Sequence, residues 1–209
     1  MTPTFLLGAV ATFKNELKVV FGVLALILAL PVLGVMVLVD TGIPGVSSAL
    51  ASADPTTQTV EVHDPLGKVV AQISASTVWP VGGVVTLEFG QPDPPFQPFH
   101  TGIDIASPNH QVGDPVVAFM AGKVIYSGYD NFGFGNHVII DHGNNITSIY
   151  GHLDSLGVPK GQEVQAGTII GTRGTTGWST GPHLHFQINV YGIPVNPRTF
   201  VSGDPPGSR

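Results

Sequence analysis

The sequence predicts a mainly β protein, in which an antiparallel β-sheet domain is preceded by one N-terminal transmembrane helix. The first observation behind this prediction is composition: the 209 residues include 27 Gly and 18 Pro, and only 11% are charged. Such a composition favours short strands joined by tight turns over a helical bundle. The second observation is one long apolar run near the N-terminus, and the third is a series of short apolar runs after it.

Charge and cysteine content exclude several classes of function. The formal net charge is −6 and Lys and Arg together number 8, so a nucleic-acid partner, which needs a basic surface, is not expected. The chain has no Cys, which rules out a disulfide framework, a zinc site built from cysteines and a cysteine nucleophile.

The first predicted element is a transmembrane helix over Val19–Val39, preceded by a cytoplasmic N-terminus of residues 1–18. The run carries no charge, and at about 1.5 Å per residue it spans the roughly 30 Å hydrocarbon core of a bilayer. Lys14 and Lys18 precede it, and no Lys or Arg follows it closely. The positive-inside rule therefore predicts a single-pass protein of the cell membrane, with the rest of the chain on the extracytoplasmic side.

A cleaved signal peptide is the alternative to this anchor. Ala51-Ser52-Ala53 has the small-residue pattern of a cleavage site, and cleavage near Ala53 would give a secreted protein. The apolar run is longer than the core of an ordinary signal peptide, and the cleavage pattern lies far beyond its end. We therefore favour the retained anchor.

Residues 40–76 are predicted to form a linker and a small β hairpin. Thr41–Pro55 is rich in Gly, Pro, Ser and Ala, which is typical of a linker. Two β-branched runs, Thr59–Val62 and Lys68–Ile73, flank the turn sequence Asp64-Pro65-Leu66-Gly67, as expected for a hairpin.

The main domain is predicted to span residues 77–201, followed by a flexible tail at 202–209. Short apolar runs alternate with Gly, Pro, Asn and Asp, and no helical periodicity occurs after residue 40. The runs expected to be strands are 84–89, 116–119, 123–126, 137–141, 146–150, 168–170 and 183–190.

The clearest candidate for chemistry is the pair His183 and His185 in the last of these strands. Side chains alternate between the two faces of a strand, so both imidazoles point to one face while Leu184 and Phe186 point into the core. Two imidazoles on one open face are suited to metal binding or proton transfer. By itself, a pair of surface histidines explains the pattern equally well.

A second motif, His100-Thr101-Gly102-Ile103-Asp104, follows the same alternation. His100, Gly102 and Asp104 are expected on one face, with Gly102 leaving space for an ion. Together with an imidazole from the other strand, they would supply two nitrogen ligands and one oxygen ligand and leave a fourth position open, as in catalytic zinc sites. Taken singly, each residue is also explained as an exposed polar side chain.

His152 lies in Tyr150-Gly151-His152-Leu153. A lone histidine at a strand end is more often structural, so His152 is a candidate site residue only because the other two motifs are present. The remaining histidines have no partner at an informative spacing, and we interpret them as structural or surface residues: His63, His110, His137 and His142.

Taken together, the motifs resemble the lysostaphin-like zinc endopeptidases, peptidase family M23. The resemblance extends over residues 79–200 and rests on blocks that occur in one order: 79–80, 89–90, 100–106, 115–118 with 121–122, 135–143, 150–153, 161–171 and 179–186. Gly151 stands where Ala is common, and Gln187 stands where Glu is frequent. The Pro-rich insert 91–98 is unusual and is expected to shape the entrance of the groove.

The resemblance implies an antiparallel β-sheet groove domain of the lysostaphin or duplicated-hybrid type, with one zinc ion per chain at the floor of the groove. His100, Asp104 and His185 would be the metal ligands, and His152 and His183 the catalytic pair. We expect His183 to act as the base toward water and His152 to donate to the oxyanion of the transition state.

The implied activity is that of a zinc-dependent endopeptidase acting on peptidoglycan stem peptides or cross-bridges, in cell wall remodelling or local wall opening. Expected partners are peptidoglycan, the membrane through the N-terminal helix, and envelope or secretion-apparatus proteins. The alternative is a catalytically inactive family member that serves as an envelope scaffold or activates another wall hydrolase. The presence of all five candidate residues favours the enzyme.

Overall fold

The computed structural model of the protein describes residues 42–54, 57, 59–73, 77–94, 96–131 and 133–208. The predicted transmembrane helix and cytoplasmic N-terminus lie outside these residues. Within the described ranges, no helix combines the length and apolar character that crossing a bilayer requires. By their contacts, residues Ile43–Arg209 group into one unit, and the description below concerns that unit.

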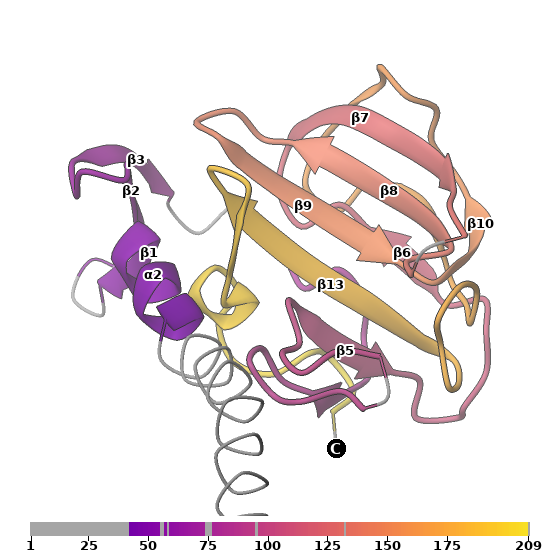
Figure 1. Ribbon diagram of the computed structural model, residues 1–209. Helices are drawn as coiled ribbons and strands as arrows, with labels where there is room; N and C mark the ends of the chain where they lie inside the picture. Colours follow the sequence, from indigo (N-terminus) through magenta and orange to yellow (C-terminus); the bar gives the residue numbers. More distant parts are fainter. Residues whose placement is uncertain are drawn as a thin grey trace, which may run out of the picture. The chain divides into compact units, whose positions relative to one another are not determined.

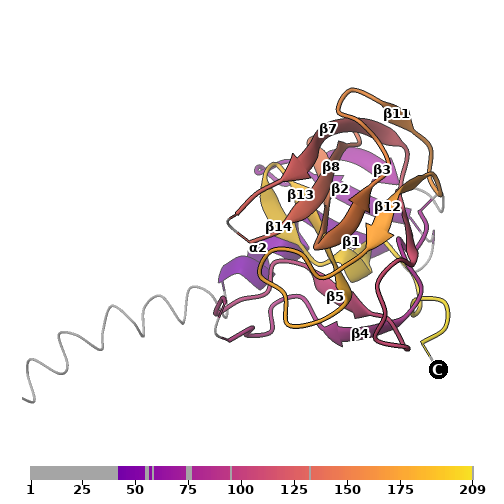
Figure 2. The ribbon, with the colours of Figure 1, turned by 90° about the vertical axis from the view of Figure 1, so that its right-hand side faces the viewer.

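An antiparallel sheet of eight strands forms the centre of this unit (Figures 1 and 2). The strands follow the order β11-β7-β8-β9-β13-β5-β4, and β14 pairs with the part of β13 that β5 does not cover. Their bounds are β4 Val84–Leu87, β5 Ile103–Ala106, β7 Gly122–Tyr129, β8 Asn136–Asp141, β9 Ile146–Gly151, β11 Glu163–Val164, β13 His183–Val190 and β14 Ile193–Val195.

Two smaller antiparallel sheets accompany it, with strand orders β10-β12-β6 and β1-β2-β3. The bounds of these strands are β1 Ala51–Asp54, β2 Thr59–His63, β3 Val69–Ile73, β6 Pro115–Val117, β10 Leu153–Leu156 and β12 Ile169–Arg173. The described helices are α2, Ile43–Leu50, and the 3-10 helix η2, Pro197–Thr199.

The prediction of a mainly β domain with antiparallel sheets is confirmed, and each apolar run predicted as a strand overlaps one of these strands. The sequence does not predict β10, β11 and β14, which have 4, 2 and 3 residues. Segments this short do not show an alternation of apolar and polar side chains that could be recognised beforehand.

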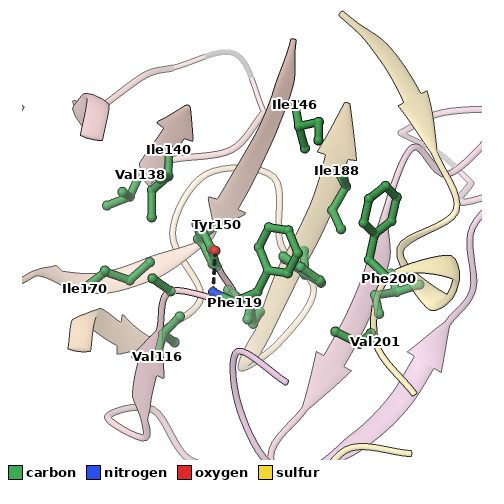
Figure 3. Close-up of a cluster of buried hydrophobic side chains, with 14 of the residues drawn as sticks. Val116, Phe119, Val138, Ile140, Ile146, Tyr150, Ile170, Ile188, Phe200 and Val201 are labelled. Atoms are coloured by element: carbon green, nitrogen blue, oxygen red, sulfur yellow. Dashed lines mark hydrogen bonds between the residues drawn. The ribbon is translucent and has the colours of Figure 1, made fainter. Parts of the chain in front are cut away.

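The main core lies between the large sheet and the β10-β12-β6 sheet. Figure 3 shows Ile140 and Ile188 of the large sheet gathered with Val116 and Ile170 of the smaller one, and all four side chains are fully buried. Phe119 fills the space between them, and its backbone N–H donates to the hydroxyl oxygen of Tyr150 at 2.9 Å. This bond satisfies the polar end of a buried aromatic side chain.

The N-terminal part of the described chain differs from the predicted linker. Residues 43–54 form α2 and β1, and β1 pairs with β2, which in turn pairs with β3 at the two predicted hairpin runs. An eight-residue helix is not stable alone, so packing explains it: Leu50 is buried, and Ser47 Oγ accepts from the backbone N–H of Asn196 at 3.0 Å. Local composition could not reveal these contacts.

The tail also differs from the flexible segment expected at 202–209. The indole N–H of Trp79 donates to the carbonyl of Ser202 at 3.0 Å, and the N–H of Gly83 donates to the carbonyl of Pro206 at 2.9 Å. Arg198 forms an ion pair with Asp204 at 3.1 Å. Despite its Gly and Pro residues, the tail is therefore held against the domain by these contacts.

Arg173, on β12, is a buried cation that joins the smaller sheet to the end of the large one. Its side chain is 1% exposed, forms an ion pair with Asp114, and donates to the carbonyl of Gly82 at 2.8 Å and to that of Ile105 at 3.3 Å. A buried guanidinium is tolerated only with such partners, since an unpaired charge in the interior is strongly destabilising.

A polar network crosses the core beside Phe119. His142 Nδ1 lies 2.8 Å from the carbonyl oxygen of Ala121, and His142 Nε2 lies 2.7 Å from Ser148 Oγ, which is 3.1 Å from the Tyr150 hydroxyl. Burial lowers the pKa of His142 to about 4 and raises the pKa of Tyr150. His142 is thus a structural residue, as expected from the sequence.

This network predicts a pH-dependent stability. The native pKa of His142, about 4, lies below the ordinary value of about 6.5, so the unfolded state binds more protons between these values. The free energy of unfolding should therefore fall as the pH drops from about 6.5 to 4, with this residue contributing a slope of up to about 1.4 kcal/mol per pH unit.

Urea unfolding of the full chain with a chelator present, at several pH values between 7 and 4, measures this slope. The variant His142→Gln should unfold at lower urea concentration at pH 7 but lose less stability on acidification. Parallel pH profiles for the two proteins would contradict the assignment.

Candidate metal centre and catalytic groove

The pairing of β13 with both of its neighbours assembles the candidate site. In this register His185 lies opposite Asp104 of β5 on one side and opposite Gly151 of β9 on the other. His152 follows Gly151 directly, and His100 precedes β5. Residues separated by more than eighty positions in the sequence are therefore brought together at one end of the sheet.

The predicted alternation of side chains on β13 is confirmed. Leu184 and Phe186 are fully buried in the core, whereas His183 and His185 line a groove on the other face. His185 is itself only 3% exposed, so this face is covered by the walls of the groove rather than open to solvent.

Three potential metal ligands converge at the floor of the groove. His100 Nε2 lies 3.0 Å from His185 Nδ1, and Asp104 Oδ1 lies 3.1 Å from each of these nitrogens. All three side chains belong to buried residues. This cluster contains the residues that the resemblance implies as ligands.

The donor atoms and their spacing fit a zinc ion. Atoms bound tetrahedrally at about 2.0–2.2 Å from zinc lie roughly 3.3–3.6 Å apart, a few tenths of an ångström more than the distances here. Two imidazole nitrogens and one carboxylate oxygen are also ligands that zinc prefers. When bound, the ion would supply Lewis-acid activation of water and of a carbonyl group.

The electrostatics of Asp104 are consistent with a cation-binding role. Burial alone would raise the pKa of its carboxyl group, but the hydrogen bonds with His100 and His185 outweigh burial and hold the pKa well below its usual range. The group therefore remains an anion in the interior, with two imidazole rings beside it.

Gly102 has a different role from the one expected. A Cβ atom at this position would lie 2.5 Å from the carbonyl oxygen of Phe186 and 3.0 Å from Nε2 and Cε1 of His185. The absent side chain thus makes room for the neighbouring strand and the His185 ring, not for an ion. The reason is that β5 and β13 pair directly at this point.

His152 and His183 form a second pair, with ring centroids 4.7 Å apart. His152 Nδ1 lies 2.8 Å from the carbonyl oxygen of Thr176, and His183 Nδ1 lies 2.8 Å from that of Gly181. A carbonyl oxygen only accepts, so each ring carries its proton on Nδ1 when neutral. The lone pair of each ring is then on Nε2.

Their surroundings differ. His183 Nε2 lies 3.5 Å from Asp104 Oδ2, beside the three-residue cluster. For His152, burial, reinforced by the nearby His183 and His185, lowers the pKa to about 3. Its backbone lies in the left-handed region, with φ of 61°, and its N–H donates to the carbonyl of Phe134 at 2.7 Å. Such backbone strain is typical of residues held at functional sites.

The insert 91–98 borders the groove, as expected. Phe96 stacks on Trp178 with ring centroids 6.1 Å apart, and these two rings meet from two different loops. No Lys or Arg lines the groove in the described part of the chain. The lining residues are Asp93, Phe96, Gln97, His100, Thr101, Asp104, Gly133, Phe134, His152, Trp178, Thr180, His183 and His185.

A neighbouring hollow shares Asp93, Asp104, Thr180 and His183 with the groove. His110 lies at its edge, while His137 is buried against Tyr126, with ring centroids 4.4 Å apart. The groove's aromatic residues were not expected from the sequence, because no local pattern marks loop side chains that meet only in three dimensions. Gln187 is two residues from His185, so the alternation of β13 could have placed it on the site face.

Comparison with known proteins agrees with this geometry. The family model for peptidase family M23 matches residues 98–197. The crystal structure of a mutant catalytic domain of the prophage-encoded M23 protein EnpA from Enterococcus faecalis is 36% identical to this chain. That match covers 57% of this chain and 92% of the EnpA domain, with a TM-score of 0.50. The chain belongs to peptidase family M23.

The relatives that this chain matches are named for two different functions. The DD-carboxypeptidase/endopeptidase Mpg of Neisseria meningitidis is 44% identical over 98 residues, which cover 47% of this chain and 22% of Mpg. The murein hydrolase activator NlpD of Salmonella dublin is 38% identical over 147 residues, which cover 70% of this chain and 37% of NlpD. The chain thus spans well under half the length of these relatives.

The M23 family is zinc-dependent, and the cluster predicts where this member would bind its metal. Asp104→Ala and His185→Ala should each lower the zinc content from about one ion per chain to a small fraction, since each removes one of three ligands. Metal analysis of the full chain after zinc loading and dialysis measures this. His110→Ala, which lies near the groove but outside the cluster, is the matched control. Full zinc content in both ligand variants would place the metal elsewhere.

Proposed function

We propose that the chain is a zinc-dependent endopeptidase that hydrolyses peptide bonds in peptidoglycan stem peptides or cross-bridges. One observation carries the proposal: His100, Asp104 and His185 form a buried ligand cluster, and His152 and His183 stand beside it in the same groove. A scaffold has no need to bury a carboxylate and three imidazoles beside a fourth, half-buried one, because desolvating these groups costs free energy.

The environments of the two outer histidines support distinct roles. His152 stays neutral over a wide pH range, because burial lowers its pKa to about 3. Since its proton is on Nδ1, its Nε2 can accept a proton from water. The donor role toward the oxyanion then belongs to His183, which can donate from Nε2 only when that nitrogen also carries a proton. The carboxylate oxygen Asp104 Oδ2, 3.5 Å from this nitrogen, would accept from such an N–H group. This is the reverse of the order expected from the sequence, and we propose it on the basis of these hydrogen bonds and this burial.

The groove supports an extended, weakly charged peptide as the substrate. Phe96 and Trp178, whose rings are in contact, line this groove, and a second hollow adjoins it at His183. A relative named for peptidoglycan cleavage, the peptidoglycan DD-endopeptidase ShyA of Vibrio cholerae, which is 43% identical over 97 residues, supports peptidoglycan as the source of that peptide.

The proposed activity is tested by incubating the zinc-loaded full chain with purified peptidoglycan and identifying the released fragments by mass spectrometry. New peptide ends are expected from the unaltered chain. His152→Ala and His183→Ala should each slow their release by about 100-fold or more, since each removes a proton-transfer or oxyanion contact.

His63→Ala, on β2, is the matched control and should release fragments at the unaltered rate. Release that does not depend on His152 or His183 would contradict the assignment. Absence of release, combined with faster release by a second wall hydrolase added to the reaction, would favour the activator function named for NlpD.

We further propose that the domain acts at the outer face of the cell membrane, held there by the apolar run Val19–Val39. Ala51-Ser52-Ala53 lies in β1, which is paired with β2, so cleavage after Ala53 would cut β1 and remove α2 together with most of that strand. This favours a retained anchor over release near Ala53.

After expression in a bacterial host, the chain should remain in the membrane fraction through a high-salt wash and dissolve only with detergent. A chain recovered in the soluble fraction, with its N-terminus near residue 54, would support the signal peptide instead.

A further inference from the structure

One ring nitrogen of His185 faces away from the ligand cluster. Nδ1 belongs to the cluster, and Nε2 lies 3.3 Å from Oε1 of Gln187, two residues further along β13. Both side chains lie on the same face of the strand, because residues two apart share a face. The ring thus stands between the metal position and the Gln187 amide.

The amide of Gln187 is held in one orientation. Thr101 Oγ1 donates to Gln187 Oε1 at 2.6 Å, and Gln187 Nε2 donates to Asn189 Oδ1 at 2.7 Å. Gln187 is 6% exposed, so water competes little for these bonds. The carbonyl oxygen of the amide therefore faces His185.

This orientation has a chemical consequence for the ring. An amide oxygen accepts a hydrogen bond, so it stabilises His185 with its proton on Nε2 and its lone pair on Nδ1. Asp104 Oδ1, 3.1 Å from Nδ1, attracts the same proton to the other side of the ring. Turning the amide by 180° would place an N–H group against Nε2 and favour the proton on Nδ1, where a metal ligand needs a lone pair.

The other imidazole of the cluster lacks such a partner. His100 Nδ1 is buried and has no hydrogen-bond partner among the described residues. Of the two imidazole rings, only that of His185 is therefore oriented by a hydrogen bond from its outer nitrogen, and the partner in that bond is Gln187.

We propose that Gln187 is a positioning residue, held by Thr101 and Asn189, which keeps His185 in the tautomer that can bind the metal. The proposal rests on the zinc centre of the proposed function. Hydrogen-bond partners of this kind fix the tautomer and basicity of ligating histidines, and their loss typically weakens metal binding by about 10- to 100-fold.

The experiment measures the zinc dissociation constant of the full chain by competition with a chelator. Gln187→Leu should bind zinc about 10- to 100-fold more weakly, because Nε2–H loses its acceptor. Gln187→Glu should bind at least as tightly as the unaltered chain, because a carboxylate is a stronger acceptor. Thr101→Val should weaken binding, because one of the two hydrogen bonds that hold the amide orientation is then lost.

A spectroscopic readout separates positioning from general stability. In the zinc-loaded protein, the Nε2–H proton of His185 should give an NMR signal that moves downfield in Gln187→Glu and upfield in Gln187→Leu. Ser148→Ala is the matched control, because it removes a buried hydroxyl of the same sheet outside the groove. It should change neither the zinc affinity nor this signal.

Equal zinc affinities for Gln187→Leu and the unaltered chain, with an unchanged signal, would overturn the proposal and leave the proposed function intact. An unaltered chain that binds no zinc would overturn both. If Gln187→Leu does not fold, the other two variants suffice. Weaker binding by Gln187→Glu, or unchanged binding by Thr101→Val, would each contradict the role of Gln187.

Discussion

Strand β13 pairs with β5 on one side and with β9 on the other, and the rest of the site depends on this register. It places His185 opposite Asp104 and beside Gly151, so that His100 and His152 arrive from the two neighbouring segments. A shift of one residue would turn every side chain of β13 to the opposite face and would exchange the histidines for the core residues. Burial of Leu184 and Phe186 in the core therefore also fixes the position of the three potential metal ligands.

One face of β13 therefore packs into the hydrophobic core, and the other face carries residues of the candidate site. The core face contributes apolar burial, which is the main favourable term in folding. The site face holds a carboxylate and imidazoles that would each cost free energy to bury alone. Their mutual hydrogen bonds offset part of this cost, and a bound cation would offset more.

The outer part of the groove is built differently, from loops. His152 and His183 are oriented by the backbone carbonyls of Thr176 and Gly181, which belong to one loop that also carries Trp178. A single segment before β13 therefore sets the tautomers of both histidines and one wall of the groove. His152 is additionally held in a left-handed backbone conformation. The orientation of these two side chains thus depends on loop geometry as well as on strand register.

By itself, the sequence determined the antiparallel β class, the faces of β13, and the five candidate residues, because alternation with period two and short motifs are local properties. The tertiary structure alone decided that residues 43–54 fold onto the domain, that the C-terminal tail packs, and that Gly102 makes room for His185 and not for an ion. It also joined the Gln187 amide to Thr101 and placed Phe96 against Trp178. These features arise from contacts between segments distant in the sequence, and no local pattern encodes such contacts.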